Sequence, residues 1–340
     1  MALPAIRAIR MRHPEARIVL LTDRHPDSGF VSSWDVVAPT GWVDAVQYYE
    51  PKAGPRAILR NAVTIAKILR TVAPTAAYML QDRSLAQYFR DWLFLRVTVP
   101  RAKRHFPKLP SPLPRRLFGQ VRRAEPEWKR LLAVADHGAK CMDEFSMPAS
   151  AAGESEIDLV CQRAGLSNQR RWLAVAPGSK MPAKVWPVER YAAVGRMLIQ
   201  EHPDLDLVIL GGAEDISLGD NLCVSWSGRG YNLAGRLSIQ GAAALLRRCV
   251  GYLGNDTGTM HLAATSGIRC VALFSARDRA GKWEPIGHGH AIIRREVNCA
   301  GCMLEICLTN QNKCLSLISV DEVVQAVNAL LSQAPRVRST

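Results

Sequence analysis

Apolar and polar residues alternate along this chain in short segments, which predict strands and helices in turn. Residues 2–12 place Leu3, Ile6 and Ile9 at helical spacing. Residues 16–22 form a short, mostly apolar run suited to a buried parallel strand. The elements expected in the first third are a helix, two strands and a second helix, at residues 2–12, 16–22, 43–48 and 57–71.

Residues 100–114 interrupt this pattern, because they carry five prolines among basic residues and are expected to form a loop. A connecting helix is expected at 157–164, and regular strand–helix units follow it. The later strands are expected at residues 172–176, 205–210, 249–254 and 270–274, and the later helices at 191–201, 238–248 and 320–331. Repeated units of this kind predict a parallel, doubly wound α/β sheet that binds ligands at the carboxyl ends of its strands.

Three of the expected strand ends carry polar residues beside glycines. They are the pairs Gly178 and Lys180, Gly211 and Glu214, and Asp256 and Thr257. Asp256 is placed to cap the helix that follows, and His261 lies about one turn further along. Because the start of a helix offers free N–H groups and a positive dipole end, the third turn predicts a phosphate or pyrophosphate site. A capped helix without a ligand fits this one segment equally well.

Charge is distributed unevenly along the 340 residues. The net charge is +14, and residues 51–130 alone hold 18 Lys and Arg against four acids, whereas the remainder is neutral. A basic segment of this kind attracts nucleic acid, anionic lipid or a phosphorylated substrate. Aromatic residues are few there and no nucleic-acid-binding motif is present, so we expect no nucleic-acid partner. A solubilising surface is the remaining alternative.

Two further features bear on location. The sequence shows no apolar run of about 20 residues, the length that a membrane span needs. Residues 2–12 contain Arg7, Arg10 and Arg12 within an expected helix, which is unlike a secretory signal. We therefore expect a cytoplasmic protein, with peripheral contact at the inner face of the inner membrane as an option that the basic segment opens.

Four stretches in the second half, taken together, resemble glycosyltransferase family nine, the ADP-heptose:lipopolysaccharide heptosyltransferases and their relatives. They read PGSKMPAKVWPVERYAAV, LVILGGAED, NLAGRLSIQGAAALL and LGNDTGTMHLAATSGIRCVALF, and the opening MALPAIRAIRMRHPEARIVLLT is also similar. The resemblance covers nearly the whole chain and is weakest between residues 50 and 150. It implies a GT-B fold, with two Rossmann-like domains that have parallel sheets and face a cleft.

The resemblance also implies a domain organisation and a set of donor-binding residues. Residues 1–152 would bind the acceptor, 153–318 would bind the nucleotide sugar, and 319–340 would form a C-terminal helix and tail. Lys184 would stabilise the diphosphate leaving group, Glu214 would hold the ribose and Leu237 would lie near the base. The donor-binding set that the motif positions imply is Ser179, Lys180, Lys184, Glu214, Leu237, Asp256, Thr257, Gly258 and His261.

The chain departs from the family pattern at its start. The family has a strand ending in Gly-Asp just before the helix that here begins at Leu3, and its aspartate is the proposed general base. The first strand of the N-terminal domain is thus apparently missing, and its loss would leave a gap between neighbouring strands. Either further residues precede Met1 or the chain is a variant. Asp23 and Asp82 are possible substitutes that nothing singles out, so no base is assigned.

The function implied by the resemblance is inverting, metal-independent transfer of a heptose-like sugar from a nucleotide diphosphate. The acceptor would be a lipopolysaccharide core or another anionic glycolipid or glycan. One alternative is a catalytically impaired nucleotide-sugar-binding protein with a regulatory or scaffolding role, which the missing strand and base favour. A nucleotide-sugar epimerase of the same architecture is a weaker alternative, because its acids and histidines are not found.

Four cysteines lie close together, in the spacing C-x2-C-x4-C-x6-C. They are Cys299, Cys302, Cys307 and Cys314. Four thiolates so near in sequence can form a tetrahedral structural site for zinc or iron, and a reducing compartment favours this over disulfides. Some heptosyltransferase relatives bind iron through such a cluster. A loop of reduced cysteines is the alternative, and no cofactor is expected for catalysis itself.

Overall fold

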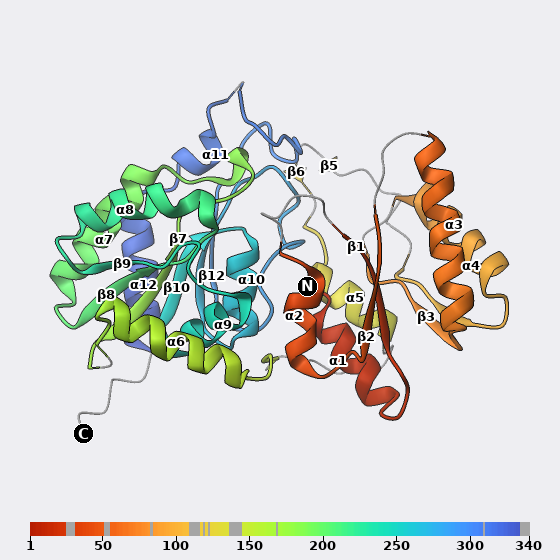
Figure 1. Ribbon diagram of the computed structural model, residues 1–340. Helices are drawn as coiled ribbons and strands as arrows, with labels where there is room; N and C mark the ends of the chain where they lie inside the picture. The colour runs from red at the N-terminus through yellow and green to blue at the C-terminus, as the bar shows by residue number, and fades with distance from the viewer. Residues whose placement is uncertain are drawn as a thin grey trace. The chain divides into compact units, whose positions relative to one another are not determined.

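Figure 1 shows the protein as a computed structural model, which describes residues 1–24, 31–50, 55–81, 84–108, 116–117, 120–121, 123–135, 145–167, 169–308 and 310–333. The chain divides into two compact units. Unit 1 comprises Met1–Pro114 and Glu125–Met142, and unit 2 comprises Arg115–Ala124 and Asp143–Thr340. Within the described ranges, no helix is long and apolar enough to span a bilayer.

Unit 1 contains short strands alternating with helices. Its strands are β1 (Val19–Asp23), β2 (Ala45–Tyr49), β3 (Ala76–Tyr78) and β4 (Lys103–His105). Its helices are α1 (Leu3–Arg12), α2 (Ser33–Val37), the 3-10 helix η1 (Ala38–Thr40), α3 (Pro55–Val72), α4 (Leu85–Thr98) and α5 (Glu127–Ala135). The four elements expected in the first third are confirmed as α1, β1, β2 and α3. The loop expected at 100–114 is corrected in part, because residues 103–105 form β4.

The strands of unit 1 form two separate sheets. β1 pairs in parallel with β2, and β3 pairs in parallel with β4. No described strand pairs with both β1 and β3. Within the described residues, the strands of unit 1 therefore do not form one continuous sheet.

Each half of unit 1 has a small core of its own. Ala5 and Ile9 of α1 pack against Leu131 and Ala135 of α5. On the other side, Leu69 of α3 packs with three residues from α4 and the turn that follows it, namely Leu95, Val99 and Ala102. Helices α3 and α4 therefore lie side by side (Figure 1).

Unit 2 contains a larger and more regular set of elements. Its strands are β5 (Arg116–Leu117), β6 (Gln120–Val121), β7 (Arg171–Ala176), β8 (Leu205–Ile209), β9 (Gly230–Asn232), β10 (Gly251–Asn255), β11 (Cys270–Phe274) and β12 (Ala291–Arg294). Its helices are α6 (Ala151–Ala164), η2 (Pro182–Lys184), α7 (Val188–Glu201), η3 (Ala213–Asp215), α8 (Ile216–Ser225), α9 (Ile239–Arg248), α10 (Gly258–Thr265), α11 (Lys313–Ser316) and α12 (Val320–Ser332). All the strands and helices expected after residue 155 are confirmed, most of them with shifted ends.

Six strands of unit 2 form one parallel sheet in the order β12-β11-β10-β7-β8-β9. When β7 to β12 are counted as strands 1 to 6, the order is 6-5-4-1-2-3. This is the Rossmann order, in which the direction of winding reverses between the first and fourth strands. That switch point lies between β7 and β10. In such sheets, the crevice outside the carboxyl ends of these two strands is where ligands bind.

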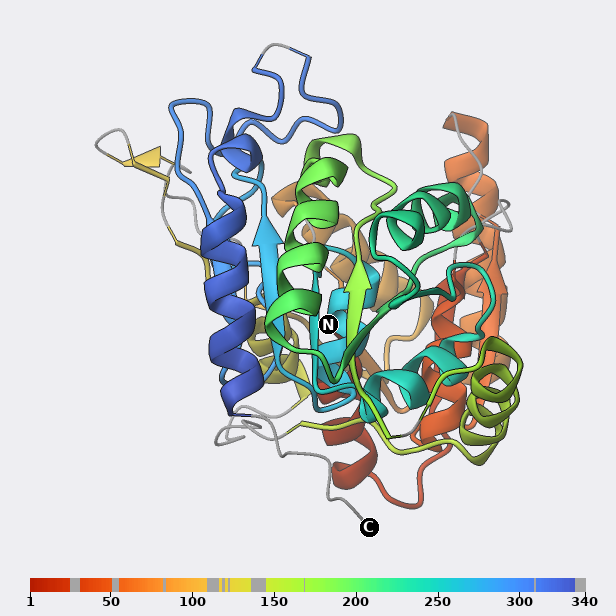
Figure 2. The same cartoon turned by 90° about the vertical axis from the view of Figure 1, so that its left-hand side faces the viewer.

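Helices cover both faces of this sheet. On one face α7 and α12 run side by side (Figure 2), and their apolar residues join α8 and the strands in the main core. On the other face α10 packs on β10 and β11 and contacts α9, which in turn packs on α6. Strands β7, β8, β10 and β11 are almost wholly buried, which explains why most of their residues are apolar.

Unit 2 begins earlier and ends later than the expected donor domain. The chain enters it after residue 142, whereas a boundary was expected after 152. Contacts explain the difference, since the Met147 amide donates to Thr265 O at 2.7 Å and the Ser150 hydroxyl bonds to Gln240 at 2.5 Å. The expected separate segment 319–340 also belongs here, because Val323 and Val327 of α12 are buried in the main core. Residues 334–340 lie outside the described ranges.

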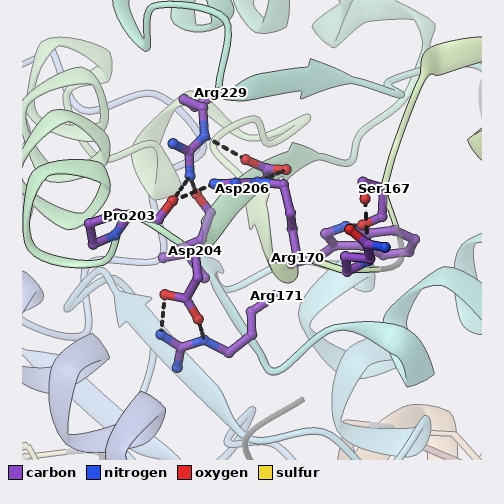
Figure 3. Close-up of polar contacts among 10 residues, drawn as sticks. Ser167, Arg170, Arg171, Pro203, Asp204, Asp206 and Arg229 are labelled. Carbon is purple, nitrogen blue, oxygen red and sulfur yellow. Dashed lines mark hydrogen bonds and ion pairs between the residues drawn. The ribbon is translucent and has the colours of Figure 1, made fainter. Parts of the chain in front are cut away.

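The opposite, amino-terminal end of the sheet is closed by ion pairs (Figure 3). Asp206 on β8 is only 1% exposed and accepts from Arg170 at 2.8 Å and from Arg229 at 2.7 Å. The Arg229 guanidinium also donates to the carbonyl oxygens of Pro203 and Leu205, both at 2.6 Å. The buried carboxylate is therefore compensated by two guanidinium groups.

Candidate functional site

The two loops at the switch point are joined by one buried side chain, that of Asn255. It ends β10, is 0% exposed, and its Nδ2 donates to Pro177 O at 2.7 Å, in the loop after β7. Its Oδ1 accepts from the Trp186 amide at 3.2 Å and from the Tyr191 hydroxyl at 3.0 Å. Burial raises the pKa of Tyr191 far above its ordinary value, so that hydroxyl stays protonated and can donate. Asn255 therefore fixes both ends of the segment 177–186.

That segment carries Lys184, which forms an ion pair with Asp256. The Lys184 Nζ lies 2.7 Å from Asp256 Oδ2, and both side chains are largely buried. Burial raises the pKa of Asp256, while the Lys184 charge and hydrogen bond act in the opposite direction. His261 Nε2 lies 4.0 Å from the other carboxylate oxygen of Asp256. Two of the predicted residues, Lys184 and His261, thus lie beside the carboxylate of a third, Asp256.

Helix α10 begins at the same place with no side-chain cap. Its N-cap is Thr257, which is extended and accepts no cap hydrogen bond, so the expectation that Asp256 caps this helix is wrong. The Asp256 carboxylate turns to Lys184 instead. The space around Gly258 is open, with no atom within 4 Å of where a Cβ would stand. An uncapped, accessible helix start beside a lysine has the features of an anion site.

The loops after β7 and β8 meet at Asp215. The Gly212 amide donates to Asp215 Oδ2 at 3.0 Å. A Cβ added at Gly178 would lie 2.0 Å from Asp215 Oδ1, and one added at Gly211 would lie 2.4 Å from Oδ2. Burial raises the pKa of Asp215. A side chain at either turn would therefore displace the Asp215 carboxylate, so glycine suits the close approach of the two loops.

Two predicted residues lie near each other on this pair of loops. Lys180 Nζ is 4.0 Å from Glu214 Oε1, with both side chains nearly half exposed. The Ser179 hydroxyl accepts from the Met181 amide at 3.2 Å, which holds the turn before η2. Leu237 is partly buried in the loop between β9 and α9, one strand further from the switch point.

Two residues that organise the site are absent from the predicted set, Asn255 and Asp215. Asn255 has a signal in the sequence, since it is a polar residue that closes an apolar strand. Asp215 follows the same Gly-Gly pair as Glu214, and the prediction selected Glu214 in its place. Of the substitute bases considered, Asp23 is the exposed last residue of β1, and Asp82 lies outside the described residues.

The cysteine cluster does not form the expected metal site. All four cysteines are described, and within the described part of the chain no three His, Cys, Asp or Glu side chains lie close enough to share a metal ion. Cys302 is exposed, and the pKa of Cys314 is raised, mainly by burial and less by Cys299 and Cys307. The spacing alone could not show that the described thiols do not come together as a set of metal ligands.

The cysteine-bearing loop instead braces the segment that carries Lys184. The Ala183 amide donates to Glu305 O at 2.9 Å, and Asn312 Nδ2 donates to Pro182 O at 3.2 Å. Arg277 holds the same loop through the carbonyls of Leu304 and Met303, at 2.6 and 2.8 Å. These bonds give the loop a structural role beside the site.

Comparison with known proteins identifies the relatives of this chain. The family model of glycosyltransferase family 9 (heptosyltransferase) matches residues 122–312, which is more than half of the chain. Lipopolysaccharide heptosyltransferase 2 of Salmonella typhimurium is 31% identical over 154 residues, covering 43% of each chain. The protein of the same name from Escherichia coli is 28% identical over 193 residues, covering 55% of this chain and 54% of its own. The chain thus spans about half the length of these curated relatives.

Solved structures support the fold over the whole chain. The E. coli ADP-heptose lipopolysaccharide heptosyltransferase II has a TM-score of 0.66 at 20% identity and covers 98% of this chain and 94% of its own. A family 9 glycosyltransferase from Veillonella parvula has a TM-score of 0.70 at 17% identity, covering 98% and 93%. These likenesses confirm the expected GT-B fold class of two Rossmann-like α/β domains. From the matched family model, this chain belongs to glycosyltransferase family 9, the heptosyltransferases.

Proposed function

We propose that the protein transfers a heptose-like sugar from a nucleotide diphosphate donor to a lipopolysaccharide core. The observation that carries this proposal is the meeting of Lys184 with the uncapped start of α10 at the switch point of a Rossmann sheet. A diphosphate needs positive charge and N–H donors at one place, and this place offers both. Membership in family 9 supplies the class of reaction, and the relatives' names supply heptose and lipopolysaccharide.

The donor would lie across the three strand-end loops. Its diphosphate would meet the amides at Gly258 and the ammonium of Lys184, with Ser179 as a hydroxyl partner. Thr257 would contribute its place at the helix start, since its hydroxyl is buried. Glu214 would hold the ribose hydroxyls and Lys180 would remain close to it, while Leu237 would pack near the base. Asp256 and His261 would face the sugar.

In the proposed reaction an acceptor hydroxyl attacks the anomeric carbon as the bond to the diphosphate oxygen breaks. The acceptor loses its proton to a base that is not among the assigned residues, and the configuration inverts. The leaving diphosphate gains negative charge, which Lys184 and the α10 dipole would neutralise. Because Asp256 holds Lys184 at 2.7 Å, the ammonium is positioned before the donor arrives. These two features support transfer without a metal ion.

The acceptor and the location follow from charge. Residues 51–130 hold 18 Lys and Arg against four acids, and the acceptor of the relatives is a lipopolysaccharide. The basic segment is suited to an anionic glycolipid of this kind. We therefore propose a protein that works in the cytoplasm, at the inner face of the inner membrane.

A transfer assay tests this proposal. ADP-heptose and a core lipid without heptose are incubated with the protein in the presence of EDTA, and products are followed by mass spectrometry and NMR. We expect a gain of one heptose with inverted configuration, which Lys184→Met abolishes. Binding of the donor without transfer would support the alternative of a regulatory nucleotide-sugar-binding protein. Absence of donor binding would contradict both functions.

A further inference from the structure

Exposed apolar side chains concentrate on two helices of unit 1. Of the 19 large hydrophobic residues that are exposed among the described ones, nine lie on α3 and α4. They are Ile58, Leu59, Val63, Val72, Leu85, Phe89, Trp92, Leu93 and Val97. Helices of soluble proteins normally face water with polar residues, and a contiguous apolar surface marks an interaction site.

Helix α4 shows the arrangement most clearly. Leu85, Phe89, Leu93 and Val97 recur every four residues and so form one stripe along the helix, and each is more than half exposed, up to 70% at Val97. The opposite side of α4 is occupied already, because Leu95 packs against α3. The stripe is therefore a second apolar face of α4, and its side chains are not part of the α3–α4 core.

Basic residues are abundant on the same two helices. Helix α3 contains Arg56, Arg60, Lys67 and Arg70 and no acid, and residues 51–108 hold 12 Lys and Arg against Asp82 and Asp91. Arg60, Lys67, Arg70 and Arg96 are exposed. Asp91 is compensated by Arg90 at 2.8 Å. Among the described residues of α3 and α4, the exposed charged side chains are thus all basic.

We infer that the outer face of α3 and α4 docks the protein on an anionic lipid bilayer. Apolar and aromatic side chains flanked by arginine and lysine match a membrane interface, where the chains enter the acyl boundary and the cations meet the headgroups. A second copy of the protein fits this face poorly, because pairing it with itself would bring like charges together. The inference rests on the proposed function only where it identifies this bilayer as the inner membrane.

Vesicle flotation tests the inference without donor or acceptor. The full chain is mixed with neutral phosphatidylcholine vesicles, or with vesicles containing about one third phosphatidylglycerol. We expect binding to the anionic vesicles alone, weakened by salt because charges at the surface are screened. The double variant Phe89→Ser/Trp92→Ser should bind about tenfold more weakly, since each buried aromatic ring stabilises the bound state.

A matched control removes exposed apolar groups from helices of unit 2. Leu159 on α6 and Val224 on α8 are 53% and 83% exposed, and Leu159→Ser/Val224→Ser should bind vesicles like the wild type. Equal vesicle binding by the α4 variant and the wild type would overturn the inference, as would equal binding to neutral vesicles. Concentration-dependent dimers that the α4 variant abolishes would overturn it in favour of a second copy. Because donor binding is measured separately by calorimetry, failure here is distinct from failure of the proposed function.

Discussion

At the scale of single residues, the site depends on two polar side chains that play different parts. Asn255 joins the loop after β7 to the end of β10 through bonds at 2.7, 3.0 and 3.2 Å. Lys184 supplies the charge, and its position depends on the loop that Asn255 holds. Asn255 therefore holds the loops together, and Lys184 is the residue that we propose to meet the diphosphate.

Replacing Asn255 by alanine should weaken both the fold and the site. Its buried partners Pro177, Trp186 and Tyr191 would lose their hydrogen bonds, so we expect unfolding to become easier by about 3 kcal/mol. Donor affinity should fall about tenfold because Lys184 is less well held. Urea denaturation and calorimetry with ADP measure the two effects. Asn328→Ala is the control, since Asn328 bonds to Glu201 and His202 on another part of unit 2 and should leave ADP affinity unchanged.

The Lys184–Asp256 pair predicts a pH dependence. The folded pKa of Asp256 is raised above its ordinary 3.8 by burial, and Lys184 limits that rise. In Lys184→Met the pKa should rise further, so the folded state holds its proton to higher pH. Stability should then fall as the pH rises from about 4 through the raised pKa, and reach a loss of about 3 kcal/mol above it.

Urea denaturation of Lys184→Met between pH 5 and pH 8 measures this effect. Lys180→Met is the control, because Lys180 lies 4.0 Å from a half-exposed Glu214 and its pair is solvent-screened. A difference between Lys184→Met and wild type that is constant over this pH range would show that Asp256 does not depend on Lys184.

At the scale of elements, the start of α10 is the feature that we propose to bind the donor phosphates. Gly258 has open space around it, whereas Gly178 is packed against Asp215. Substitution at these two glycines should therefore separate binding from folding.

Gly258→Ala should bind donor poorly and fold well. Alanine in the first turn of a helix stabilises by about 0.5 kcal/mol relative to glycine, while its methyl group would stand where the diphosphate approaches. We expect ADP affinity to fall about tenfold with no loss in thermal midpoint. Gly178→Ala should instead lower the midpoint, because its methyl group would meet the Asp215 carboxylate at 2.0 Å. Unchanged ADP affinity in Gly258→Ala would place the phosphates elsewhere.

Element types in unit 2 could be predicted because its buried strands have continuous apolar sequences. β11 was predicted at its observed ends, residues 270–274. β9 and β12 were missed, since Gly230–Asn232 is three residues long and Ala291–Arg294 is a partly buried edge strand. The helix cap at Asp256 was assigned wrongly, because nothing in the sequence shows that Lys184, 72 positions earlier, pairs with that carboxylate.

At the scale of the whole molecule, the two ends of the unit 2 sheet have separate tasks. The carboxyl end carries the uncapped helix and glycine-rich loops, while the amino end carries the saturated cluster of Asp206, Arg170 and Arg229 (Figure 3). The repeated strand–helix units in the sequence predict a parallel sheet of this kind. The sequence does not show the ion pairs of Asp206, because their partners are distant along the chain.

This division of tasks predicts a variant that loses stability alone. Asp206→Ala leaves two guanidinium groups without their buried partner and should cost about 3 kcal/mol of unfolding free energy. ADP affinity at the other end of the sheet should stay within about twofold of wild type. Urea denaturation and calorimetry on the same preparation test this. A parallel loss of ADP affinity would mean that the two ends are coupled.

The central claim is tested most directly by a crystal structure of the protein with bound ADP. The account predicts the β-phosphate within hydrogen-bond distance of the Gly258 amide and the Lys184 ammonium, outside the ends of β7 and β10. ADP density on any other surface, with Lys184 and Gly258 facing only solvent, would contradict it.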